Sequence, residues 1–167
     1  PDGAIYMADW YDSRLSHLDP HDTWDKERGR IYRLSATGAK PAPKFDLAKL
    51  NTDELIQCFA NTNKWFRQTA LRIFYDRHDA QALPALRKLV FQEQGQVALE
   101  ALWAVNASGG FDEKFALQAL DHPNPFIRYW TVRLIGDTKK ISPALQQKFV
   151  ALARTERPTR PTRSRPS

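Results

Sequence analysis

The pattern of apolar and polar positions divides the 167-residue chain into a short β region and a long helical region. Residues 4–10 are a short apolar and aromatic run, and residues 29–34 combine the apolar Ile31 and Leu34 with the polar Arg30 and Arg33. Both segments are predicted to be strands. Between residues 45 and 154 the apolar residues recur at helical spacing, without strand-like alternation longer than a few residues. The pattern therefore predicts a mainly α chain that is preceded by two strands.

The two predicted strands cannot form an independent fold. Residues 11–28 separate them, and this connection of 18 residues is too long for a tight hairpin. Two strands alone do not bury enough apolar surface to be stable in water. We therefore expect them to belong to a sheet whose other strands precede Pro1, and the chain to be a fragment. Residues 35–51 are predicted to be a linker, since the first part holds two prolines and a glycine.

Residues 52–154 are expected to form about seven helices packed as antiparallel pairs. Thr52 is the predicted N-cap of the first helix, and the pairs Asn124-Pro125 and Ser142-Pro143 each place a capping residue before a proline. Three leucines, one in each repeat described below, are expected to face a shared core, and no strand is expected within residues 63–135. These leucines are Leu71, Leu102 and Leu134.

An internal repeat relates three of the predicted helices. Residues 63–74 superpose on residues 124–135 at an offset of 61, so that Arg67 coincides with Arg128. A middle copy at residues 96–103 fits at spacings of 28 and 33. Helix pairs of roughly 30 residues with this aromatic–aliphatic–Arg start resemble HEAT repeats. The resemblance implies a HEAT-like α-solenoid, in which each pair stacks on its neighbours.

The two repeated arginines allow two interpretations. Arg67 and Arg128 could form a row that binds anions, or each could tie one turn of the repeat to a nearby acid. We favour the structural role, with Asp76 and Asp137 as the nearby acids.

The single cysteine limits the chemistry of the chain. Because Cys58 is the only cysteine of the 167 residues, they cannot form an internal disulfide, a CxxCH haem site or a Cys-rich zinc site. Cys58 lies on the same expected helix as Leu55 and Phe59, so we expect its side chain to be buried as a small apolar group. No run of 18 apolar residues is present, so no membrane-spanning helix is expected.

The net charge of +6 comes mostly from the C-terminal end. Residues 154–167 contain five arginines and one glutamate, which give +4 and leave only +2 for the rest of the chain. An excess of basic residues that is confined to a tail is weak evidence for a nucleic-acid-binding domain, so nucleic acid is not expected as a partner. Residues 155–167 are predicted to be a disordered basic tail, because residues 157–167 contain no apolar side chain.

The connection at residues 11–28 and its flanks are dense in reactive groups. Carboxylates at this density could bind a hard cation such as Ca²⁺, with Asp9 and Asp12 as candidate metal ligands. Asp12, His17 and Asp22 are the candidates for contact with a cofactor. The alternative is that the aspartates cap turns through their own side-chain oxygens, and this alternative is favoured. No nucleotide-binding, zinc-protease or hydrolase motif is present.

The same region carries a family-like motif. It consists of DGAIYMADWYD at residues 2–12, His17, Asp22 and GRIYR at residues 29–33. This motif resembles the end of the β-propeller in large bacterial putative membrane-bound dehydrogenases. Those chains join a glucose/sorbosone-dehydrogenase-like propeller to HEAT repeats and often to a c-type cytochrome. The resemblance covers residues 1–34 closely, and the order of modules also fits residues 45–154.

The resemblance implies a periplasmic or surface-associated oxidoreductase with sugar-like or alcohol substrates. Pyrroloquinoline quinone and Ca²⁺ would be cofactors of the full-length protein, and haem c would be present only with a downstream domain. Residues 1–34 would be the end of the propeller and contact the upstream blades. The helical residues would be a scaffold that binds a protein partner, without catalysis by this piece alone. The alternative is a stand-alone HEAT-repeat module that binds proteins.

Overall fold

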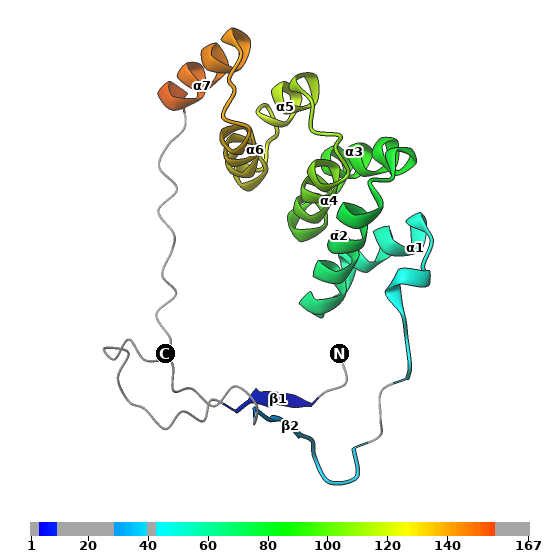
Figure 1. Cartoon of the computed structure of the whole chain (residues 1–167). Helices are drawn as coiled ribbons and strands as arrows, with labels where there is room; N and C mark the ends of the chain where they lie inside the picture. Colours follow the sequence, from blue (N-terminus) through cyan, green and yellow to red (C-terminus); the bar gives the residue numbers. More distant parts are fainter. Residues whose placement is uncertain (1–3, 10–28, 40–42, 156–167) are drawn as a thin grey trace, which may run out of the picture. The chain divides into compact units, whose positions relative to one another are not determined.

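The computed structural model describes residues 4–9, 29–39 and 43–155 (Figure 1). These residues form seven α-helices and one small antiparallel sheet of two strands. The mainly α composition predicted from the sequence is therefore confirmed. Contacts divide the chain into two units, Pro1–Asp46 and Leu47–Ser167, and each is described by itself.

The first unit contains the two strands, β1 (Ile5–Ala8) and β2 (Ile31–Leu34). They pair antiparallel, with Ile5 opposite Leu34 and Ala8 opposite Ile31. The side chains of both strands are exposed, and Ile31 has 77% of its surface accessible. Among the described residues, the sheet therefore has no core of its own, as expected for two strands without neighbours.

The second unit contains the seven α-helices and three short 3-10 helices. The α-helices are α1 (Thr52–Gln57), α2 (Lys64–Arg77), α3 (Leu83–Gln92), α4 (Gly95–Ala107), α5 (Glu113–Ala119), α6 (Pro125–Asp137) and α7 (Pro143–Thr155). The 3-10 helices are η1 (Leu47–Lys49), η2 (Cys58–Ala60) and η3 (Ala80–Ala82).

Capping residues fix where the helices begin. The N-cap of α1 is Asn51 rather than the predicted Thr52, because Asn51 and Glu54 form a capping box. Asn124 caps α6 with its side-chain oxygen 2.9 Å from the backbone nitrogen of Phe126, as predicted. Ser142 lies immediately before α7, and its hydroxyl accepts a hydrogen bond from the backbone of Leu145. Both Asn-Pro and Ser-Pro predictions are confirmed.

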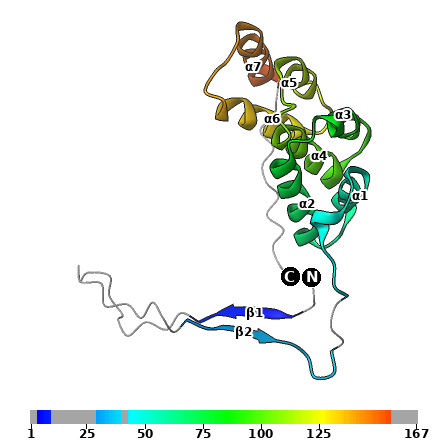
Figure 2. The ribbon, with the colours of Figure 1, turned by 45° about the vertical axis from the view of Figure 1, so that its right-hand side comes forward.

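The helices contact one another in a regular order. Helix α4 packs against α2 on one side and α6 on the other, while α3 packs against α4 and α5 packs against α6. Helix α5 also contacts α7. Figure 2 shows α2, α4 and α6 following one another within this unit. Alternate helices along the chain are therefore neighbours in space.

Two clusters of buried side chains stabilise the second unit. The larger one contains residues of the four helices α1, α2, α3 and α4, together with Phe115 and Ala119 of α5 and Ile127 of α6. The smaller one joins α5, α6 and α7. Leu102 is fully buried in the larger cluster, and the half-buried Leu71 and Leu134 pack against it, so all three predicted leucines face the core. No strand occurs in the described stretch 63–135, which also agrees with the prediction.

Two details differ from the sequence-based expectations. The end of the expected linker forms η1, whose Leu47 is buried in the larger cluster, and Arg77 donates a hydrogen bond to the Ala48 carbonyl at 2.7 Å. Cys58 is half-buried rather than buried, because it starts η2 at the edge of the cluster. Partial burial, and secondarily the charge of Glu54, raise the pKa of its thiol.

Candidate functional site

The acidic connection between the strands lies mostly outside the described residues. Asp12, His17 and Asp22 belong to residues 10–28, so the predicted cofactor contacts are outside the described part of the chain. Asp9 is described, and its backbone nitrogen donates to the Arg30 carbonyl at 2.7 Å, which extends the pairing of the strands. Within the described ranges, no three histidine, cysteine or acidic side chains gather as a metal site would require.

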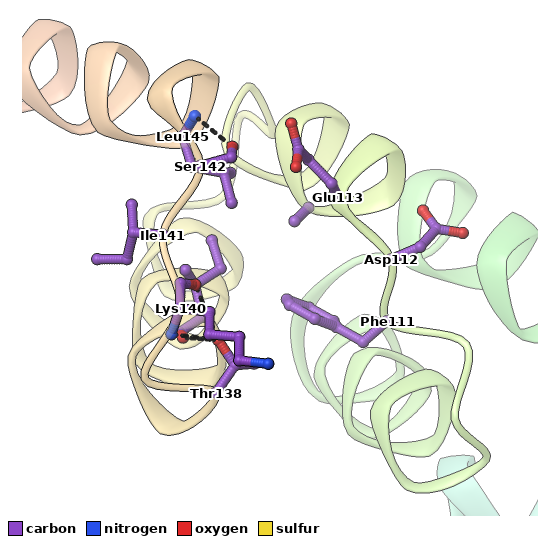
Figure 3. A pocket seen from close by; sticks show the side chains of 10 residues that line it. Phe111, Asp112, Glu113, Thr138, Lys140, Ile141, Ser142 and Leu145 are labelled. Carbon is purple, nitrogen blue, oxygen red and sulfur yellow. Dashed lines mark hydrogen bonds between the residues drawn. The ribbon is translucent and has the colours of Figure 1, made fainter.

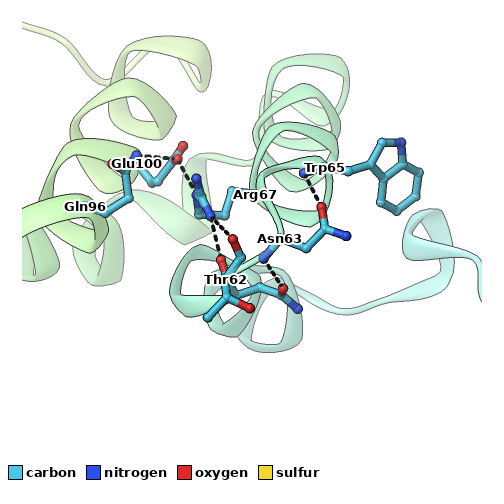
Figure 4. Close-up of polar contacts among 7 residues, drawn as sticks. Thr62, Asn63, Trp65, Arg67, Gln96 and Glu100 are labelled. Atoms are coloured by element: carbon cyan, nitrogen blue, oxygen red, sulfur yellow. Dashed lines mark hydrogen bonds and ion pairs between the residues drawn. The ribbon is translucent and has the colours of Figure 1, made fainter. Parts of the chain in front are cut away.

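Arg67 is the centre of a polar network between α2 and α4 (Figure 4). Its Nε donates to Glu100 Oε1 at 3.1 Å, and one terminal nitrogen donates to the carbonyls of Asn61 and Thr62 at 2.7 and 3.0 Å. Gln96 donates to the same Glu100 oxygen at 2.7 Å. Only 4% of the Glu100 side chain is accessible, so its charge is buried and depends on these donors.

Arg128 repeats the local part of this network. It donates to the carbonyls of His122 and Pro123 at 2.7 and 2.9 Å, which are the sixth and fifth residues before it, as Asn61 and Thr62 are before Arg67. In both helices an arginine therefore closes the turn that precedes the helix. These contacts support the structural interpretation of both arginines.

The acids that pair with the repeat arginines differ from the expected ones. The partner of Arg67 is Glu100 of the neighbouring helix and not Asp76 of its own helix. Asp137 pairs with Arg133 at 3.3 Å, one turn away on the same helix, rather than with Arg128. The expectation that named Asp76 and Asp137 was wrong because it considered only residues close in sequence.

Aromatic rings form a contact between α4 and α6. The rings of Trp103 and Trp130 meet edge to face, with their centroids 5.0 Å apart and their planes at 82°. Tyr129 meets Trp130 in the same way at 5.8 Å, and 63% of its surface is accessible. Such edge-to-face contacts hold the rings in fixed positions.

A groove of about 480 Å³ lies between α2 and α4. Tyr75 on α2 and Trp103 on α4 supply its aromatic lining, and Arg72 is the only charged side chain among the described residues that line it. Tyr75 is 60% exposed and meets the ring of His78 edge to face. The remaining lining residues are Gln68, Leu71, Asn106 and Ala107. The groove offers aromatic faces, two amides and one guanidinium to a ligand. We call it the α2–α4 groove.

A second groove, of about 390 Å³, lies where α5, α6 and α7 meet (Figure 3). Its rim mixes charges, because Asp112 and Glu113 line it together with Lys140. Asp112 is already engaged: it caps α5 and accepts a hydrogen bond from Arg87 at 2.6 Å. The bond from the Phe115 backbone, followed by the bond from Arg87, lowers the pKa of Asp112. This carboxylate therefore stabilises the fold.

His122 is a buried polar residue that the sequence analysis did not single out. Its Nδ1 accepts a hydrogen bond from the backbone nitrogen of Asn124 at 3.0 Å, so this nitrogen carries no proton. Burial is the main cause that lowers the pKa of His122, which favours the neutral ring. The only sequence signal for a role at the start of α6 is the position of His122 directly before Pro123 and Asn124. His122 supports the start of α6.

Comparisons of the chain with models of protein families, with curated proteins and with solved structures gave no match. Among the described residues, no helix combines the length and the apolar character that crossing a membrane requires.

Proposed function

We propose that the chain joins the last strands of a β-propeller to HEAT-type repeats in a dehydrogenase-like protein. In this proposal, residues 47–155 are a scaffold and an interaction surface. The motif at residues 2–12 and 29–33 supports the propeller assignment, because it resembles that segment of the putative membrane-bound dehydrogenases. The order of a β segment followed by helices agrees with that family.

The repeated arginine network is the observation that carries the solenoid part of the proposal. Arg67 and Arg128 make the same two carbonyl contacts, 61 positions apart, after asparagine N-caps in equivalent places. Three residues set against one another by the repeat, Ala70, Ala98 and Thr131, are all fully buried. A repeated local structure whose copies pack on their neighbours is the defining property of a helical solenoid.

The exposed sheet supports the propeller part. Six large apolar side chains on β1 and β2 have between 46% and 77% of their surface accessible. Apolar side chains on both faces of a pair of strands are covered when the strands lie inside a larger sheet. Neighbouring strands and blades of a propeller would supply that cover.

The catalytic chemistry belongs, in this proposal, to the propeller of the longer protein. That protein would be a periplasmic or surface-associated quinoprotein oxidoreductase acting on sugars or alcohols, with pyrroloquinoline quinone and Ca²⁺ as cofactors. Asp12, His17 and Asp22 would contact the cofactor from the rim of its site, and Asp9 with Asp12 would be nearest to the metal. Haem c would require a further downstream domain.

A stand-alone binding module is the second candidate. The residues of both buried clusters lie between Leu47 and Leu152, so the helical unit has a core without residues 1–46. A unit with its own core can fold and bind a partner independently. This candidate shares the interaction role and lacks the link to a dehydrogenase.

Dye-linked dehydrogenase assays with pyrroloquinoline quinone and Ca²⁺ test the proposal. The 167-residue chain is expected to give no turnover, because catalysis needs a site that positions substrate and cofactor together. A longer protein that includes the upstream blades is expected to oxidise sugars. There, deletion of residues 47–155 should leave turnover per bound cofactor unchanged and abolish complexes with a partner protein.

Two substitutions in the longer protein test the cofactor assignment. His17→Ala and Asp22→Ala should each weaken turnover or cofactor retention, whereas Asp53→Ala, on the surface of α1, should change neither. Turnover by the 167-residue chain would contradict the scaffold role. Unchanged kinetics in both His17→Ala and Asp22→Ala would contradict the assignment of the connection.

A further inference from the structure

The α2–α4 groove has two aromatic walls that are held in place by other rings. Trp103 is fixed by Trp130, and Tyr75 is fixed by His78, whose centroid lies 5.4 Å from that of the tyrosine ring. These contacts restrict the two rings before a ligand binds, which lowers part of the entropic cost of association. The exposed face of Tyr75 and the half-buried Trp103 suit an aromatic or branched aliphatic side chain.

Arg72 gives the groove a cation that no acid of the described residues neutralises. It is exposed and makes no ion pair with any described residue, although Asp76 lies one turn further along α2. The repeat-equivalent Arg133 on α6 does pair with its own acid, Asp137, at 3.3 Å. A guanidinium prefers a carboxylate, which it can bind through two parallel hydrogen bonds.

Two amide side chains complete the groove. Gln68 and Asn106 line it from α2 and α4, and neither side chain forms a hydrogen bond within the described part of the chain. An amide offers both a donor and an acceptor, which matches the alternating groups of a peptide backbone. A single cation with two amides does not match the row of basic residues that a nucleic-acid backbone requires.

We propose that the α2–α4 groove binds a peptide segment of a partner protein that carries an acidic residue next to an aromatic or branched aliphatic one. The carboxylate pairs with Arg72, the apolar side chain lies between Tyr75 and Trp103, and the peptide backbone bonds to Gln68 and Asn106. The groove volume of about 480 Å³ is within the range of sites for drug-sized ligands, which are similar in size to a few side chains. This inference rests on the interaction role proposed above and names the chemistry of its partner.

A phage-displayed library of random peptides, selected on the 167-residue chain, is the first experiment. The selected sequences should place Asp or Glu within about two positions of Trp, Phe, Leu or Ile, because the groove sets its charged and aromatic groups on adjacent turns of α2. Selection of no peptide, or of peptides without an acid, would overturn the inference.

Affinity measurements with the selected peptide locate the site. Arg72→Ala and Tyr75→Ala should each raise its Kd, measured by fluorescence anisotropy, about tenfold or more, and Arg72→Lys should recover part of the loss. Changing the acid of the peptide to its amide should raise the Kd for the wild-type chain by the same factor as Arg72→Ala does. The same change should not raise the Kd for Arg72→Ala any further. Arg133→Ala is the matched control, because it removes the same charge from the equivalent position of α6.

The outcomes separate this inference from the proposed function. Arg72 and Tyr75 are exposed, so their variants should keep the circular dichroism spectrum of the wild type. If Kd is unchanged in both variants, the peptide binds elsewhere and the assignment of the groove is wrong, while the interaction role stands. The interaction role fails separately, if deletion of residues 47–155 leaves the complexes of the longer protein intact.

Discussion

Breaking the ion pair between Arg67 and Glu100 from one side should be among the most destabilising single substitutions in the helical unit. The side chains have accessible fractions of 15% and 4%, so both charges have lost most of their hydration. Arg67→Ala would leave Glu100 buried with only Gln96 as a donor, and would leave the Asn61 and Thr62 carbonyls without theirs. Removing one partner of a buried pair costs about 3–5 kcal/mol.

Glu100→Gln provides the matched comparison. The amide oxygen can still accept from Arg67, so only the charge-assisted part of the hydrogen bond is lost. Bonds to charged groups contribute about 1.5–3 kcal/mol and neutral ones about 0.5–1.5 kcal/mol, so we expect a loss of about 1 kcal/mol. Arg133→Ala removes an exposed pair on α6 and should cost less than about 0.5 kcal/mol.

Urea denaturation followed by far-ultraviolet circular dichroism measures these free energies of unfolding. The slope of the free energy against urea must agree between variants, because a changed slope would mean that the exposed surface of one state has changed or that unfolding is no longer a single transition. The reasoning is refuted if Arg67→Ala loses less than about 1 kcal/mol, or if it loses no more than Arg133→Ala. Either result would show that Glu100 is not held as a buried charge.

Three further predictions concern the fold. The pKa of His122 is lowered in the folded state, so the unfolded chain binds more protons than the folded chain near this pKa. The free energy of unfolding should therefore fall as the pH drops below the usual histidine pKa. His122→Gln should make this fall smaller, as measured by urea titrations between about pH 7 and 5. Gly110→Ala would place a Cβ 2.3 Å from Leu83 and should cost about 1–3 kcal/mol, whereas Gly136→Ala meets nothing within 4 Å and should stabilise α6 by up to about 1 kcal/mol; equal unfolding midpoints would contradict this. Asn124→Ala should lower the free energy of unfolding by about 1 kcal/mol through loss of the α6 cap, and an unchanged midpoint would show that the cap is not needed.

The sequence predicted the features of the fold that depend on neighbouring residues. The starts of α6 and α7 follow from Asn124-Pro125 and Ser142-Pro143, because a cap and a proline act within one turn. The start of α1 was misplaced by one residue, since Asn51 and Thr52 are both good caps and only the bond to Glu54 distinguishes them. Helical spacing of apolar residues was sufficient to identify the faces that pack in the core.

Features that depend on distant residues could not be predicted. Glu100 lies 33 positions after Arg67, and no local pattern indicates that α4 places it against α2. The α2–α4 groove combines Tyr75 and Trp103 from helices whose relative position comes only from tertiary packing. The burial of His122 could not be predicted either, because residues of α3 and the start of α6 create its environment. The candidate connection at residues 11–28 lies outside the described residues, and its role stays a prediction.

Helix α7 buries little of its surface against the described residues, and this has a consequence for how the molecule opens. Its single buried residue is Leu145, and Lys148 pairs with Asp121 on the loop after α5. Few buried contacts mean that a segment can detach at a small fraction of the global free energy of unfolding. The amides of α7 should therefore exchange with deuterium before those of α4, whose buried residues include Ala101 and Val105. Within the described residues 47–155, a protease should cut first near residues 139–142, and the body from α1 to α4 would remain folded after the cut.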